Sequence, residues 1–181
     1  MPSDARYIIS PQGDISLTAA NYYDTILLTN QKLWVKTIMI IELVPLLPED
    51  KDITDLTCIH ASPSVAKYIS ISENYFDYVT NTNGVIYYKI IWNGILAGGV
   101  HCEYADGTMF MSVCVDELYR RRGIAEAALN QLFLTLTSGV DVIEVSIEET
   151  NVPSLLLFQK LGFLKIGKED ELITLRKLLR R

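Results

Sequence analysis

Three consecutive arginines, Arg120–Arg122, stand directly before Gly123, where a strand-like apolar run gives way to a helix-like pattern. Positive charges are unfavourable there by about 0.3–1 kcal/mol each, because the N-terminus of a helix is the positive end of its dipole. They are explained if an anion binds, since free backbone N–H groups, the dipole and the guanidinium groups would all face a phosphate. Gly123 lacks a Cβ and Ala125 is small, so a diphosphate could approach the backbone closely. The sequence therefore predicts a phosphate-binding turn.

Two elements must position this turn. Thr108–Val115 is almost continuously apolar, which predicts a central strand buried on both faces. Apolar residues then recur every four positions, at Ile124, Ala128, Leu132 and Leu136. This period predicts a helix that begins within the arginine run and ends at Gly139. The alternating segment Asp141–Ile147 predicts a strand parallel to the first, because a helix connects the two.

Turn residues divide the rest of the chain. Asn93-Gly94 and Asp106-Gly107 predict hairpins, since both residue types of each pair tolerate positive φ. Further strands are predicted at Thr37–Val44, Val85–Trp92, Ile95–Tyr104, Phe163–Ile166 and Leu172–Leu178. Helices are predicted for about ten residues from Pro48, for Ser72–Val79 with Ser72 as cap, and for about Val152–Leu161. This order predicts one mixed α/β sheet with helices on both faces.

The sequence pattern of residues 1–36 differs from that of the rest of the chain. We interpret these residues as an N-terminal extension of unknown role and residues 37–181 as the main domain. Arg6–Ser10 and Ile15–Thr18 flank a predicted turn at Pro11–Asp14. Ala19–Trp34 is interpreted as a helix. The extension could pack on the main domain, over a substrate cleft or on a second copy of the chain, so a homodimer is one expectation.

Composition excludes several classes of protein. The 181-residue chain has a net charge of −6, whereas a nucleic-acid binder would usually be basic. Three scattered cysteines and two distant histidines support neither a disulfide framework nor a metal site. No signal peptide or membrane-spanning segment is indicated, so we expect a cytoplasmic protein in a reducing compartment.

Two motifs resemble those of the GNAT N-acetyltransferases. Arg120-x-x-Gly123-x-Ala125 resembles their pyrophosphate loop, (Gln/Arg)-x-x-Gly-x-(Gly/Ala), and Ser112–Val115 resembles their fourth strand. Asn151–Phe163 resembles their second signature, which has an Asn, a small residue, an aromatic residue and then Gly-Phe. The resemblance covers about residues 37–181 and leaves the first 36 residues unexplained.

The resemblance implies a mostly antiparallel sheet with one splayed parallel pair, and a V-shaped cleft there that holds acetyl-CoA as cosubstrate without a metal. It implies that the pantetheine arm pairs with the backbone of residues 113–115, where a backbone N–H near Val115 polarises the thioester carbonyl. The residues implied to bind acetyl-CoA are Val113, Val115, Arg120, Arg121, Arg122, Gly123, Ile124, Ala125, Asn151, Ser154 and Phe158.

The catalytic groups are less well specified. Many relatives carry a tyrosine that protonates the leaving thiolate, but the matching residue here is Phe158, which has no hydroxyl. We predict Glu103 and Glu148 as bases, with His101, Glu144 and Ser146 as other strand residues able to take a proton directly or through water.

The function predicted is acetyl transfer to a primary amine on a small molecule, an amino acid or antibiotic, or a peptide N-terminus. The alternative is a non-catalytic acyl-CoA-binding sensor or interaction module of the same fold. A nucleotide-phosphate binder is disfavoured, because neither GxxxxGK(S/T) nor GxGxxG occurs.

Overall fold

A computed structural model describes residues 6–9, 15–18, 26–29, 32–35, 39–136 and 139–179. The chain forms two compact units, Met1–Ile40 and Ile41–Arg181. Each unit is described by itself.

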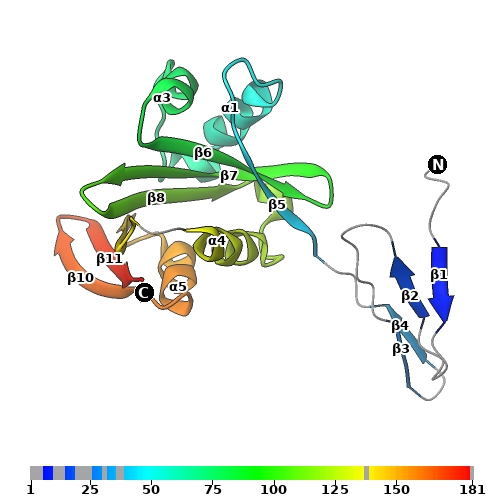
Figure 1. Cartoon of the computed structure of the whole chain (residues 1–181). Helices are drawn as coiled ribbons and strands as arrows, with labels where there is room; N and C mark the ends of the chain where they lie inside the picture. Colours follow the sequence, from blue (N-terminus) through cyan, green and yellow to red (C-terminus); the bar gives the residue numbers. More distant parts are fainter. Residues whose placement is uncertain are drawn as a thin grey trace. The chain divides into compact units, whose positions relative to one another are not determined.

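The first unit contains two antiparallel strand pairs (Figure 1). β1 (Arg6–Ile9) pairs with β2 (Ile15–Thr18), as expected for segments that flank a turn. β3 (Ile26–Thr29) pairs with β4 (Lys32–Val35), so the helix predicted over Ala19–Trp34 is wrong for these residues. The remaining residues of that prediction lie outside the described ranges. Four-residue strands are too short to show a period, and the apolar spacing in this segment also fits a helix.

The second unit is built on a seven-stranded sheet in the order β10-β11-β9-β8-β7-β6-β5. Its strands are β5 (Ile41–Pro45), β6 (Val85–Trp92), β7 (Ile95–Ala105), β8 (Thr108–Val115), β9 (Val142–Glu148), β10 (Leu164–Glu169) and β11 (Leu172–Leu178). The pair β8–β9 is parallel and the other pairs are antiparallel, as predicted. β8 is central, but only Met109, Met111 and Cys114 on it are buried and Phe110 is 44% exposed, so the predicted burial on both faces is wrong for most of the strand.

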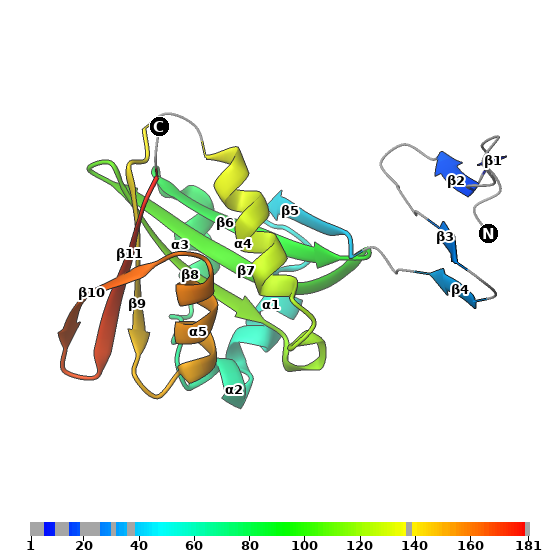
Figure 2. The same cartoon turned by 90° about the horizontal axis from the view of Figure 1, so that it is seen from below.

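Helices cover the two faces of this sheet (Figures 1 and 2). One face carries α1 (Ile53–Ala61), α2 (Pro63–Ala66) and α3 (Tyr75–Asn81), and the other carries α4 (Ile124–Thr135) and α5 (Val152–Lys160). A core of buried apolar side chains lies under α4 and α5, and a second, smaller core lies under the first three helices. Among the described residues, no helix has the length and apolar character needed to cross a bilayer.

Several predicted boundaries shift. α1 begins at Ile53, three residues after the predicted first turn, and α3 begins at Tyr75 with Asn74, not Ser72, at its N-cap. α4 begins after the arginine run and ends at Thr135, well before Gly139. The four-residue helix α2 was not predicted, because a single turn is too short for an apolar period.

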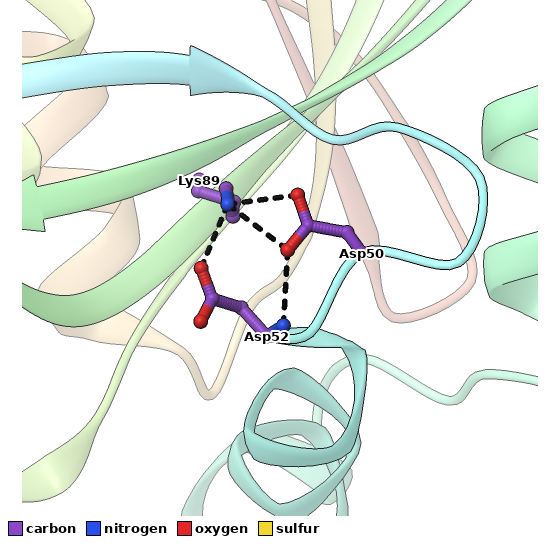
Figure 3. A network of polar contacts seen from close by, with 3 residues as sticks. All are labelled: Asp50, Asp52 and Lys89. Atoms are coloured by element: carbon purple, nitrogen blue, oxygen red, sulfur yellow. Dashed lines mark hydrogen bonds and ion pairs between the residues drawn. The ribbon is translucent and has the colours of Figure 1, made fainter.

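A partly buried ion network fixes the segment before α1 to the sheet (Figure 3). The Lys89 ammonium on β6 lies 2.8 Å from a carboxylate oxygen of Asp50 and 2.7 Å from one of Asp52. Asp50 also accepts a hydrogen bond from the backbone N–H of Asp52. Burial opposes the charged form of Asp50, but Lys89 and this N–H hold the pKa of the carboxyl below its ordinary value.

Candidate functional site

The parallel strands β8 and β9 are joined over only part of their length. Their pairing runs from Thr108 opposite Val142 to Phe110 opposite Glu144 and ends there. Beyond this point β8 continues to pair with β7 through Val115, while β9 pairs with β11 through Glu148. Figure 2 shows the two strands running apart. Towards their C-terminal ends, β8 and β9 are therefore not paired with each other.

A cavity of about 460 Å³ occupies this opening and is lined from both faces of the sheet. The turn before α4 and the first turn of α5 contribute from one face, and the region of α2 contributes from the other. Its lining residues are Ser64, Val65, Tyr68, Ile69, Val113, Cys114, Val115, Tyr119, Arg120, Arg121, Gly123, Ile124, Ala125, Glu126, Asn151, Pro153, Ser154 and Leu157.

The turn before α4 has an unusual backbone. Arg121 and Gly123 both have positive φ, at 60° and 78°, and Gly123 is the N-cap of α4. Turns with left-handed residues direct backbone N–H groups into a concave surface that can hold an anion. No side-chain hydrogen bond caps the first turn of α4, so a ligand oxygen could accept from these N–H groups.

The three arginines of this turn lie in different places. Arg120 donates from Nε to the carbonyl oxygen of Val115 at 2.8 Å, which ties the turn to the end of β8. Arg121 also lines the cavity. Arg122 is not among the lining residues, and its guanidinium group lies 5.2 Å from the ring centre of Trp92.

Of the predicted binding residues at α5, two line the cavity and one lies in the core. Asn151 caps the helix by accepting a hydrogen bond from the backbone N–H of Ser154, and both residues line the cavity. Phe158 is only 3% exposed and packs edge-on against Phe163, with ring centres 5.0 Å apart. Leu157, one position earlier, faces the cavity in its place.

The predicted base Glu103 lies beside His101 on β7. A Glu103 carboxylate oxygen is 3.8 Å from Nε2 of His101, and Nδ1 of His101 is hydrogen-bonded to the hydroxyl of Tyr75 at 2.8 Å. Burial lowers the pKa of His101, and Glu103 opposes this shift. His101 is opposite Ser112 on β8, beside the stretch where β8 has left β9. These groups form a chain from Tyr75 to an exposed carboxylate.

The second predicted base, Glu148, is at the C-terminal end of β9. It lies near Lys67 and Tyr68, which follow α2. Tyr68 chiefly raises the pKa of Lys67, with a smaller contribution from Glu148, and Lys67 chiefly lowers the pKa of Tyr68, which Glu148 opposes. Glu144 forms an ion pair with Arg176 on β11. Ser146 lies on the same face of the strand and is exposed. Glu103 and Glu148 therefore lie on different strands, β7 and β9, and neither is among the residues that line the cavity.

Cys114 belongs to a buried polar cluster. Nε2 of His60 lies 3.0 Å from the Tyr87 hydroxyl and 3.6 Å from Sγ of Cys114. Gly99 makes room for this cluster, because a Cβ there would lie 2.1 Å from the Tyr87 hydroxyl oxygen. Burial raises the pKa of the Cys114 thiol and lowers that of His60 to about 4. Both groups are therefore neutral near pH 7, and Cys114 is a core thiol.

Sequence patterns do not identify every residue at the opening. Tyr68, Ser64 and Ile69 reach the cavity from the region of α2, and no motif marks them. Their position depends on how α2 packs beside β8, which is a tertiary relationship. Within the described ranges, no three His, Cys, Asp or Glu side chains gather closely enough to hold a metal ion.

Comparisons with known proteins agree with this geometry. A domain from Methanocaldococcus jannaschii superposes with a TM-score of 0.66 at 18% identity, over 78% of this chain and 99% of that chain. Arabidopsis thaliana NAA60, solved with acetyl-CoA, gives 0.62 at 17% identity, over 77% and 99%. Campylobacter jejuni N-acetyltransferase PseH gives 0.61 at 10%, over 77% and 99%. These likenesses establish the fold.

No curated protein sequence matches the chain significantly. The family model described as "Acetyltransferase (GNAT) family" matches residues 53–163, which include the turn before α4, the opening between β8 and β9 and the start of α5. That match covers more than half of the chain and includes both of its signature motifs. The chain therefore belongs to the GNAT acetyltransferase family.

Proposed function

We propose that this protein transfers an acetyl group from acetyl-CoA to a primary amine. The observation that carries the proposal is the end of β8–β9 pairing at Phe110, with a cavity of about 460 Å³ in the opening beyond it. A cavity of this size falls within the range that holds cofactor-sized ligands. The unbonded N–H groups at the start of α4 lie at one end of it.

The residues present fit an acyl-CoA substrate. The N–H groups of residues 121–125 and the Arg120 and Arg121 side chains would bind the diphosphate, and Gly123 leaves room for its close approach. The β8 edge at Val113–Val115 offers backbone groups to the amides of the pantetheine arm, as an added strand would. A backbone N–H at this edge would stabilise the oxyanion that forms as the amine attacks. Asn151 and Ser154 border the same arm.

The acceptor amine must lose protons. A lysine-like amine has a pKa of about 10.4 and is an ammonium ion at pH 7. We assign proton removal to Glu103 acting through His101 and a bridging water. His101 is paired with Ser112 of β8 but does not line the cavity, and the half-exposed Glu103 connects it to solvent. Glu148 is the second candidate, because it lies at the end of β9 near the cavity residue Tyr68. Replacing each glutamate by glutamine should identify which one sets the acid limb of the rate profile.

The proposed acceptor is the primary amine of a small molecule, of an amino acid or antibiotic, or of a peptide N-terminus. A cytoplasmic location is proposed with it, supported by the free thiols of Cys58, Cys102 and Cys114. The competing function is an acyl-CoA sensor without turnover. The phenyl ring of Phe158, where many relatives have a phenol, favours that alternative.

Calorimetry tests the ligand. Acetyl-CoA should bind the native protein with a micromolar Kd, and Gly123→Trp should abolish binding, because the indole would fill the turn. A matched Gly167→Trp variant, in a strand position where a new Cβ meets nothing within 4 Å, should keep the affinity. No binding by native protein at millimolar acetyl-CoA would exclude the proposal. Turnover with an amine panel then separates the enzyme from the sensor.

A further inference from the structure

Cleavage of the thioester needs a proton donor near the sulfur atom. When the amine nitrogen bonds to the carbonyl carbon, the C–S bond breaks and leaves a CoA thiolate. The side chains around the cavity that carry a titratable O–H or S–H are Tyr68, Cys114 and Tyr119. The donor must lie at the end of the cavity that holds the thioester.

The cavity has two distinct ends. The diphosphate end is the turn before α4, and Tyr119 lies there, adjacent in sequence to Arg120. The pantetheine arm separates the diphosphate from the thioester, so the acyl group must lie away from that turn. The part of the cavity lined by Val65, Tyr68 and Ile69 lies on the opposite face of the sheet from α4 and α5. Tyr68 therefore lines the part of the cavity that an acyl group would reach if the pantetheine arm crosses the sheet through the opening.

Tyr68 bridges the two rims of the opening. Its hydroxyl donates to the carbonyl oxygen of Thr150 at 3.4 Å, linking the region after α2 to the loop between β9 and α5. This hydrogen bond is long and solvent-facing, so the hydroxyl can exchange it for a stronger acceptor. The Lys67 ammonium lies 4.8 Å from the centre of the Tyr68 ring, and it lowers the pKa of the phenol.

The other two donors fit less well. Cys114 is buried against Tyr87 and His60, and burial raises its pKa, which makes it a weaker acid. The Tyr119 ring packs against Trp92, with ring centres 5.6 Å apart, on the α4 side of the sheet. Ser64 also lines the cavity, but its hydroxyl is committed to Glu117 and is a poor acid.

We propose that Tyr68 is the catalytic acid of this enzyme and that its hydroxyl proton passes to the departing sulfur. The N–C bond forms, the C–S bond breaks, and the Tyr68 proton neutralises the thiolate. The phenolate then regains a proton from solvent, which equals in number the one released by the amine. The inference rests on the proposed function, since it needs an acyl-CoA in the opening.

A titration of bound CoA tests the assignment without any acceptor. The ultraviolet absorbance of the thiolate reports the pKa of the CoA thiol, after subtraction of the ligand-free protein. A phenol donating to the sulfur should hold that pKa below the value of free CoA, and Tyr68→Phe should raise it by about one unit. Tyr104→Phe, which removes a hydroxyl on β7 outside the cavity, should leave it unchanged.

Turnover gives the second measurement. With hydroxylamine, which is largely neutral at pH 7, Tyr68→Phe should lower kcat by about a hundredfold and leave the KM for acetyl-CoA within about threefold. Substituting 3-fluorotyrosine at position 68 keeps the packing but acidifies the phenol, and it should move the alkaline limb of kcat to lower pH.

The two proposals fail in different ways. Absence of CoA binding by the native protein would overturn the proposed function and this inference with it. If CoA binds but Tyr68→Phe changes neither the thiol pKa nor kcat, the assignment of Tyr68 is wrong and the proposed function stands.

Discussion

The hydroxyl of Tyr75 lies 2.8 Å from Nδ1 of His101, and the two rings stack with centres 5.8 Å apart. Tyr75 begins α3 and His101 lies in β7, so a helix and a strand jointly fix the orientation of the imidazole. The other ring nitrogen is thereby aimed towards Glu103. An imidazole held in this way can pass a proton outward without reorienting.

The contacts of His101 lead to a prediction for the pKa values of the two histidines. The chain has only two histidines, so NMR should show two imidazole signals. Burial lowers both pKa values below 6.5, that of His60 to about 4. Because Glu103 opposes the shift of His101, Glu103→Gln should lower the pKa of His101 further and leave that of His60 in place. A His101 signal that titrates above 6.5 would contradict the proposed proton path.

The same shifts affect stability. Unfolded histidine binds a proton with a pKa of about 6.5, so protonation favours the unfolded chain wherever the folded pKa is lower. The contribution of His60 is therefore complete above about pH 6.5 and is lost as the pH falls towards about 4. Denaturant midpoints measured across this window should fall in the native protein and fall less in His60→Gln.

Replacing Gly99 by a larger residue should disturb the packing around Tyr87. The Cβ of Gly99→Ala would lie 2.1 Å from the Tyr87 hydroxyl oxygen, so the tyrosine must leave its place beside His60 and Cys114. Overpacking of this kind costs about 1–3 kcal/mol. Gly167→Ala, also in a strand but with no atom within 4 Å of the new Cβ, should change the free energy of unfolding by less than about 0.5 kcal/mol. Equal effects in urea denaturation would refute the close-approach argument.

Much of the second unit could be predicted from local signals. β6 and β8 have the predicted bounds, and the turns Asn93-Gly94 and Asp106-Gly107 adopt positive φ at both residues. Each depends on a pattern contained within a few residues, namely an apolar run or a turn pair. The parallel β8–β9 pair also follows from the helix between them.

Contacts between distant segments could not be predicted. Phe158 fits the second motif, yet it lies one position, or about 100°, around α5 from Leu157, and this rotation directs it into the core. Tyr68 reaches Thr150 across 82 positions, and no pattern in the sequence marks either partner. Helix phase and tertiary packing decide such contacts, and both depend on the whole fold.

The ion pairs of Lys89 with Asp50 and Asp52 should stabilise the fold less at acid pH. Since the folded pKa of Asp50 is depressed, its contribution to stability is present above the unfolded value of about 3.9 and is lost as the pH falls through the folded one. Lys89→Met leaves two partly buried carboxylates without a cation. Removing one partner of a buried pair costs about 3–5 kcal/mol; here we expect about 2–3, because both acids retain some exposure.

The variant should also change the pH dependence. Without Lys89, burial is the dominant influence and raises the pKa of Asp50, so the loss of stability on acidification should begin at higher pH than in the native protein. The double variant Asp50→Asn with Lys89→Met removes one buried charge of each sign and should recover part of the loss. Thermal unfolding from about pH 7 to about pH 3 measures both effects, and parallel curves for all three proteins would disprove this role of the ion pairs.

The arginines before α4 should differ in their effect on CoA affinity. Arg120 lines the cavity and is held to the Val115 carbonyl, so its guanidinium is preorganised beside the proposed diphosphate site. Charge-assisted hydrogen bonds of this kind contribute about 1.5–3 kcal/mol, so Arg120→Ala should weaken CoA binding by about tenfold or more. Arg122 lies against Trp92 instead, and Arg122→Ala should weaken binding less. Calorimetry at low and high salt separates direct contact from general charge, because screening reduces only the exposed, long-range part. If Arg122→Ala weakens CoA binding more than Arg120→Ala does at high salt, the diphosphate binds beside Arg122 and the proposed site is wrong.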